Sequence, residues 1–239
     1  MKGQQGVALL LVLWVLAVLS TLLAGLAGTV QLQQRQAGWQ AAHVRALLAA
    51  EAGLSQAAIS LQARDLKARW AANGQPHALT FDQAQVAVSV RSERGKLDLN
   101  AASQADVDRL LRACGAAPSV AEAIAQALQQ QRDGSTPLRA LEEFRELPGM
   151  SAALYRRVLP LVTVWSGQAQ PDPSLAPPRL ARALGLPTVR TPNPDAGQIL
   201  TVTSEARLPG GVHAQVRVTL MMTLAKEGAR PYRVLRWQE

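Results

Sequence analysis

The segment QQGVALLLVLWVLAVLSTLLAG, residues 4–25, decides how this chain begins. From Val7 to Val30 the sequence carries no charged side chain. A helix of this length would extend about 36 Å, which exceeds the roughly 30 Å hydrocarbon core of a bilayer. The apolar part of a secretory signal peptide is usually shorter, about 7–15 residues. We therefore predict that residues 7–30 form a transmembrane helix that the mature protein retains.

The composition narrows the class of protein without identifying it. Hydrophobic residues make up 48% of the 239 residues and aromatic residues only 4%. Alanine and leucine dominate instead, and they favour helices and cores built from small side chains. The formal charge of +8 suits a nucleic acid, an anionic membrane surface or an acidic partner, and a genomic bias toward Arg and Ala explains it equally well. Cys114 is the single cysteine, so a disulfide within the chain is excluded, and its apolar surroundings predict a core residue.

Helical character continues beyond Val30. Residues 31–72 are amphipathic, and the first clear stop signal is Asn73-Gly74. The apolar positions that recur with helical spacing, and that we expect to face a globular body, are Val44, Leu47, Leu48, Leu54, Ala58 and Leu61. A single helix from Val7 to Ala72 is therefore predicted, apolar on all sides first and amphipathic afterwards.

Two regions show the alternation that is typical of strands. Residues 76–100 contain Val86, Val88 and Val90 at every second position, and Lys96 to Asn100 is interpreted as a short return strand. Residues 198–239 contain a longer alternation that predicts a three-stranded antiparallel meander. Together these regions predict one small sheet covered by the long helix, which is an α+β fold.

The region between the two sets of strands is predicted to be helical. Residues 101–166 contain four helical patterns separated by turn signals, with Ser103 as a candidate helix cap. Residues 167–197 hold most of the prolines in this half of the chain, so we interpret them as a linker with at most a short helix from Arg179 to Leu184. The fold would then carry an all-helical domain inserted in its sheet.

Catalytic constellations are not found in this sequence. The histidines His43, His77 and His213 show no ligand spacing with one another or with Cys114. Glu142 and Glu143 would point about 100° apart on a helix, so we interpret them as a solvated face. We expect a protein that is not an enzyme, with no catalytic residue, no resident metal and no cofactor.

Nucleic-acid binding is an alternative because two helix–turn–helix segments resemble helix-hairpin-helix modules. Such modules hold phosphate with a Gly-hydrophobic-Gly turn, whose bare amides approach the backbone of the nucleic acid. The turns here are Cys114-Gly115-Ala116-Ala117 and Pro148-Gly149-Met150-Ser151, and both lack the second glycine. Arg156 and Arg157 follow the second turn, but a structural helical pair is the favoured interpretation, without nucleic acid as a partner.

The beginning of the chain resembles the class III leader of type IV pilins and pseudopilins. Residues 1–6, which contain Lys2 and end in Gly6, precede the apolar run directly. In that family a prepilin peptidase cuts after the glycine and the new N-terminal residue is methylated. The resemblance therefore implies cleavage between Gly6 and Val7, and N-methylation of Val7. Leu11 would be the fifth mature residue, where most members of the family have glutamate.

Further segments resemble the K-type minor pseudopilin of the bacterial type II secretion system. These are GKLDLNAAS (95–103), FRELPGMSAALYRRVLPLVTV (144–164) and PYRVLRWQE (231–239). An apolar fifth residue and a helical domain inserted in a pilin sheet belong to the same family pattern. This chain is on the short side, and the second helical portion of the family is reduced to the Pro-rich stretch.

The resemblance implies a structural role in the inner membrane, with the globular part in the periplasm. The protein would initiate and cap a pseudopilus together with I-type and J-type minor pseudopilins and other pseudopilins. Calcium is implied by the family alone, since no acidic cluster here has a convincing spacing. Two alternatives remain: a membrane-anchored DNA receptor of the competence type, and a secreted domain cleaved near Gly25-Leu26-Ala27.

Overall fold

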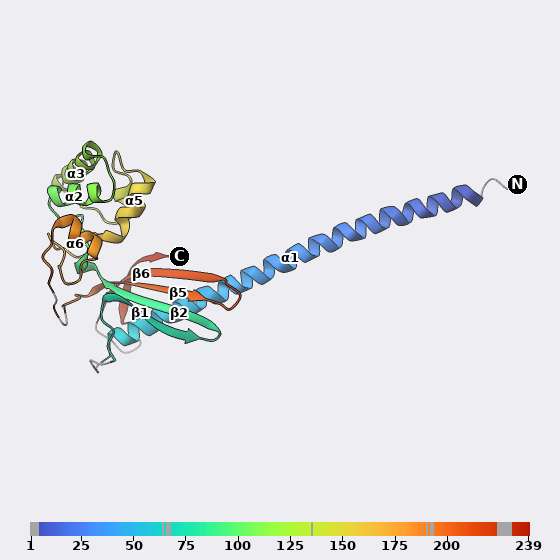
Figure 1. Cartoon of the computed structure of the whole chain (residues 1–239), viewed down its shortest axis with the longest axis horizontal. Helices are drawn as coiled ribbons and strands as arrows, with labels where there is room; N and C mark the ends of the chain where they lie inside the picture. Colours follow the sequence, from blue (N-terminus) through green and yellow to red (C-terminus); the bar gives the residue numbers. More distant parts are fainter. Residues whose placement is uncertain are drawn as a thin grey trace.

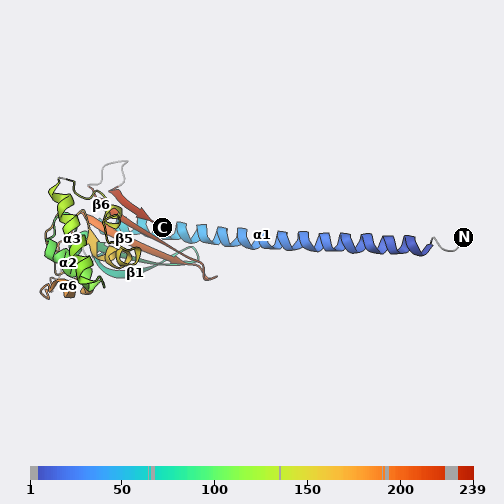
Figure 2. The same ribbon diagram turned by 90° about the horizontal axis from the view of Figure 1, so that it is seen from above.

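The computed structural model describes residues 5–63, 65, 68–134, 136–189, 191, 194–223 and 231–239, without the side chains of residues 5–10 and 23–30. Helix α1 (Gln5–Leu61) is a long rod that carries a two-part globular body at its C-terminal end (Figures 1 and 2). The prediction of one helix as far as Ala72 is wrong by about three turns. Beyond Leu61 the chain reverses direction to enter the sheet, and Trp70 fixes this reversal by donating a backbone hydrogen bond to Ser60 O and stacking on His77, with ring centroids 4.0 Å apart.

A five-stranded antiparallel sheet lies against the C-terminal part of α1. Its strands are β1 (Asn73–Phe81), β2 (Ala84–Ser92), β5 (Ile199–Arg207), β6 (His213–Met222) and β7 (Tyr232–Gln238), in the order β1-β2-β5-β6-β7. The meander predicted for the C-terminal part is confirmed, and so is the α+β class. Residues 224–230 of the predicted meander lie outside the described residues.

Small residues form the helix face that contacts the sheet. Gly53 is buried, and a Cβ atom added to it would lie 2.4 Å from Ser204 Oγ and 2.9 Å from Val86 Cγ1. The other members of this core are Ala49, Ala50, Leu54, Ala57, Ala72, Ala84, Val86, Val88, Val90, Leu200, Val202, Ala206, Val216, Val218 and Leu220. The prediction that Val44 and Leu48 face the globular body is wrong, because they are 52% and 56% exposed. The close approach of helix and sheet accommodates mainly alanine and glycine, with Leu54 beside them, whereas Val44 and Leu48 are turned outward.

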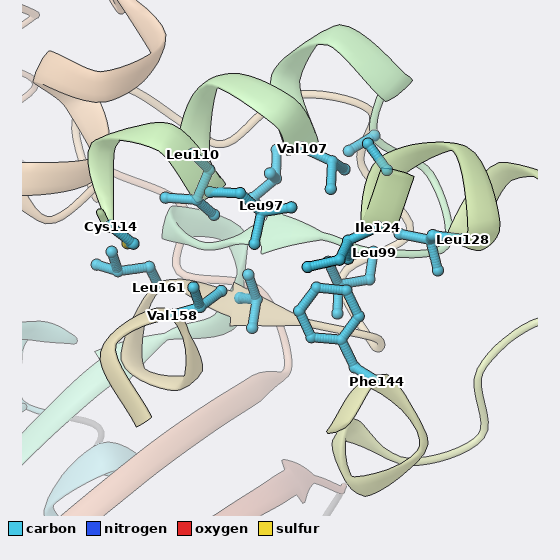
Figure 3. Close-up of a cluster of buried hydrophobic side chains, with 14 of the residues drawn as sticks. Leu97, Leu99, Val107, Leu110, Cys114, Ile124, Leu128, Phe144, Val158 and Leu161 are labelled. Atoms are coloured by element: carbon cyan, nitrogen blue, oxygen red, sulfur yellow. The ribbon is translucent and has the colours of Figure 1, made fainter. Parts of the chain in front are cut away.

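The segment between β2 and β5 forms a second, helical unit. It contains η1 (Glu93–Gly95), α2 (Gln104–Ala113), α3 (Pro118–Asp133), α4 (Leu141–Arg145), α5 (Ala152–Val158), η2 (Leu159–Leu161) and α6 (Pro178–Leu184). Ser103 caps α2 as predicted, since its side chain accepts a hydrogen bond from Asp106 N at 3.1 Å. Figure 3 shows the core of this unit, in which Phe144, Leu97, Leu110 and Ile124 meet.

The connections of the helical unit differ from the prediction in two places. Lys96 to Asn100 does not return along the sheet, because β3 (Leu97–Asp98) pairs in parallel with β4 (Val162–Thr163) in a separate two-stranded sheet. The Pro-rich stretch is not merely a linker, because Leu180 and Leu184 of α6 are buried in the helical core. Both features depend on contacts with distant segments, and local patterns do not encode such contacts.

Candidate assembly surface

The predicted leader site lies at the start of α1. Gly6 and Val7 fall in the first turns of this helix, and their side chains are not described, so cleavage and methylation stay predictions. In the part of the chain that was described in full, no helix combines the length and hydropathy required to cross a bilayer. The predicted span, residues 7–30, includes positions 7–10 and 23–30, whose side chains lie outside that part.

The described part of the N-terminal rod is apolar on every side. Leu11, the predicted apolar fifth mature residue, is 62% exposed, and the eight large apolar residues that follow it are 37–69% exposed: Val12, Leu13, Trp14, Val15, Leu16, Val18, Leu19 and Leu22. A helix that is hydrophobic all round is normally buried in lipid or among other helices. Among the described residues, those of α1 that pack on the sheet lie near its C-terminal end, so this part of the chain gives the N-terminal half of the rod no such cover.

A second apolar surface follows the same helix alongside the globular body. Val44, Leu48, Ser55 and Ile59 are separated by four, seven and four residues, which places them on one stripe of α1. Val44, Leu48 and Ile59 are 52%, 56% and 65% exposed. The stripe lies opposite the Ala- and Gly-lined face that contacts the sheet. Helix α1 therefore has two packing faces, one used within the chain and one free for a neighbouring helix.

A buried ion pair marks the point where the chain leaves the sheet for the helical unit. The Glu93 side chain is fully buried, and its Oε1 accepts hydrogen bonds from Lys96 Nζ at 2.5 Å and Thr201 Oγ1 at 2.6 Å. Thr201 Oγ1 also lies 2.9 Å from Thr219 Oγ1, so the pair is connected to two strands of the sheet. Losing one partner of such a pair costs about 3–5 kcal/mol, because an uncompensated charge is left buried. No sequence pattern indicated this contact.

A second ion pair joins the last strand to the helical unit. Arg236 on β7 donates from Nε and Nη2 to Glu142 Oε1 on α4, at 3.0 and 2.6 Å. Glu142 is 59% exposed, as expected for a solvated face, and it also forms this ion pair, which the sequence did not indicate. Tyr155 lies beside this pair and donates its hydroxyl to Leu141 O at 3.1 Å, and burial raises the pKa of its phenol.

The two hairpins of the helical unit have similar backbone geometry. Gly115 and Gly149 both have φ of +87°, a conformation that favours glycine. Both arginines are exposed, but Arg157 contributes to the domain, because its Nε donates to Cys114 O at 2.6 Å. One of the two arginines considered for phosphate contact therefore joins the hairpins instead. The geometry provides no specific support for the DNA-receptor alternative.

The remaining candidate side chains lie apart from one another. His43 stacks on Trp39 of the same helix with ring centroids 5.3 Å apart, and His77 stacks on Trp70. Cys114 is 2% exposed in the helical core, as predicted. Among the described residues, no three His, Cys, Asp or Glu side chains lie close enough to hold a metal ion.

The architecture is a pilin-like fold. A long N-terminal helix packs on an antiparallel sheet, and a helical domain is inserted between the second and third strands of that sheet along the chain.

No family model matches the sequence, and no curated protein matches it. Among solved structures, a chain of the GspK-GspI-GspJ complex from the type 2 secretion system of enterotoxigenic Escherichia coli is similar, with a TM-score of 0.58 and 17% identity. The match covers 83% of this chain and 97% of that chain. The predicted resemblance to a K-type minor pseudopilin is thus confirmed at the level of the fold.

Proposed function

We propose that this protein is a K-type minor pseudopilin that initiates and caps the periplasmic pseudopilus of a type II secretion system in a Gram-negative bacterium. Its role is structural, without catalysis and without a cofactor. The observation that carries the proposal is the combination of a pilin-like body with a helical domain inserted at the end of that body remote from the N-terminus (Figure 1). The fold similarity to a chain of the GspK-GspI-GspJ complex supports the same proposal.

The apolar surfaces of α1 support assembly with other helices. The N-terminal part, apolar on all sides, suits an inner membrane before assembly and a bundle of helices afterwards. The outer stripe at Val44, Leu48 and Ile59 extends this surface beside the globular body. We propose I-type and J-type minor pseudopilins, followed by other pseudopilins, as the neighbours that cover it.

The tip position is supported by two features. The helical unit widens the globular body at its end remote from the N-terminus, and we expect this added bulk to hinder the docking of a further subunit there. Leu11 stands where a glutamate would otherwise meet the N-terminal amine of an adjacent subunit. A carboxylate at the bilayer centre costs about 2.5–3.5 kcal/mol unless a partner neutralises it. A subunit with no neighbour above it lacks such a partner, so leucine suits that position.

The first test is the N-terminal sequence and the intact mass of the protein purified from membranes of cells that express its prepilin peptidase. A mature chain that begins at N-methylated Val7 is expected. A Gly6→Leu variant, in which the residue before the cut is changed, should remain uncut and serve as the control. A mature chain beginning near Gly28 in a soluble fraction would refute the pseudopilin assignment and favour a secreted domain.

The second test addresses the subunit type. The mature protein should co-purify with the I-type and J-type minor pseudopilins of its own system, and a charged stripe variant, Leu48→Glu, should lose this association. Gln56→Glu adds the same charge at another exposed position of α1 and should retain it. Undiminished association of the Leu48→Glu variant would show that the outer stripe is not the assembly surface.

A further inference from the structure

The face of the sheet opposite α1 carries a row of polar side chains across four strands. Strand register places Arg91 of β2 beside Thr201 of β5, Thr201 beside Thr219 of β6, and Thr219 beside Arg236 of β7. With about 4.8 Å between neighbouring strands, the row spans roughly 14 Å. The next row contains Thr203 and Arg217, which are also paired in register. Cationic ends and a hydroxyl-lined centre are thus arranged along one strip of the sheet.

The helical unit turns this strip into a groove. The groove has a volume of about 230 Å³, and its far wall is formed by Leu141, Leu159, Pro160, Leu161 and Pro177. Thr201 and Thr219 are 7% and 5% exposed, so they form its floor. The wall is apolar and the floor is polar. An occupant should therefore present polar groups on one side and apolar groups on the other.

The electrostatics of the groove favour a carboxylate. Arg91, Lys96, Arg217 and Arg236 line it, and none of the described lining residues is acidic. Lys96 and Arg236 are paired with Glu93 and Glu142. Arg217 donates its Nε only to Thr203 Oγ1, at 3.4 Å, and within the described part of the chain Arg91 has no carboxylate partner. Two guanidinium groups are thus available for an anion.

A glycine beside Arg91 leaves room for its guanidinium group. Gly74 has φ of +81°, and a Cβ atom added there would lie 2.4 Å from the Arg91 Cζ. The glycine leaves the space in which this guanidinium lies against β1. A planar guanidinium presents paired donors that match the two oxygens of a carboxylate, which an ammonium does not.

We propose that this groove binds an extended acidic peptide segment of a partner protein. An extended chain directs alternate side chains to opposite sides, so its acidic residues would contact Arg91 and Arg217 while its apolar residues contact the Leu and Pro wall. Because the side chains alternate, a peptide of this kind would use both the cationic strip and the apolar wall of the groove at once. This binding does not depend on assembly through α1, so it can be tested on the isolated full chain.

The test uses the full chain in neutral detergent micelles and a fluorescein-labelled peptide that alternates aspartate and valine, followed by fluorescence anisotropy. We expect saturable binding that weakens as salt is added. The same peptide with asparagine in place of aspartate should bind at least about tenfold more weakly, since hydrogen bonds to charged groups are the stronger ones. Equal binding of the two peptides would overturn the proposal.

Variants locate the site. Arg91→Gln/Arg217→Gln should weaken binding of the acidic peptide about tenfold or more, whereas Arg156→Gln, on the exposed face of α5, should leave it unchanged. Thr203→Glu places a carboxylate beside Arg217 and should also abolish binding, provided that circular dichroism shows an intact fold. Equal losses in the Arg156→Gln variant, or displacement of the peptide by duplex DNA at lower concentration than by unlabelled peptide, would refute a peptide groove.

Discussion

The contact of α1 with the sheet makes a sharp prediction about two glycines in the same helix. Gly53 is buried, and a Cβ atom there would lie 2.4 Å from Ser204 Oγ, 2.9 Å from Val86 Cγ1 and 2.9 Å from Val88 Cγ2. Gly38 has no atom within 4 Å of its added Cβ. Replacing either with alanine increases helix propensity by the same amount, about 1 kcal/mol. The two substitutions therefore differ only in the space available to the methyl group.

The expected magnitudes have opposite signs. Overpacking a core costs about 1–3 kcal/mol, and three contacts below 3.0 Å at one site place Gly53→Ala at the upper end. After the gain in propensity is subtracted, the free energy of unfolding should fall by about 2 kcal/mol. The melting temperature should fall by about 4–8 °C for a chain of this size. Gly38→Ala should be neutral or stabilise by up to about 1 kcal/mol.

The assay is amide hydrogen exchange of the full chain in detergent micelles, with the free energy of opening measured in β5 and β6. Ser204→Ala provides an internal check, because Ser204 Oγ is buried and has no hydrogen-bond partner among the described residues. This variant should be neutral or stabilising alone, and it should reduce the cost of Gly53→Ala when the two are combined. If Gly53→Ala were tolerated as well as Gly38→Ala, the close helix–sheet approach would be refuted.

Three further predictions concern the helical unit. Phe144→Ala should destabilise this unit by about 3–5 kcal/mol, measured by amide hydrogen exchange in α2 and α3. An equal loss of stability in β5 and β6 would instead show that the unit and the sheet form a single cooperative core. Arg236→Met should lower the stability of α4 by about 0.5–1 kcal/mol, and a cycle with Glu142→Gln that shows no coupling would contradict the ion pair. Burial raises the pKa of the Cys114 thiol, and the charges of Arg179 and Arg157 partly oppose this rise. The protonated thiol therefore contributes stability that is fully present below the pKa of the unfolded thiol. That contribution is lost as the pH rises through the pKa of the folded thiol. Alkylation of folded protein should therefore be much slower than alkylation of urea-unfolded protein at the same pH, and equal rates would refute burial.

Local patterns determined several elements of this protein by themselves. The uncharged run from Val7 to Val30 specifies a helix because it contains no proline and is rich in leucine and alanine, which outweigh Gly25 and Gly28, and α1 includes all of it. The alternation from Val212 to Leu220 specifies a strand with one buried face, since a period of two directs alternate side chains to the same side. Ser103 with Asp106 specifies the start of α2, because the cap requires only residues of one turn.

Tertiary structure alone decided which faces meet. Val44 and Leu48 were expected to be buried because they are large and apolar, yet the sheet approaches α1 so closely that alanine and Gly53 occupy the contact. Leu97 and Asp98 pair with a strand more than sixty residues away, and Arg236 meets Glu142 across the chain. Hydrophobic periodicity reports which residues avoid water, but the distance between two packed elements and the partner of a charged side chain are set by segments remote in sequence.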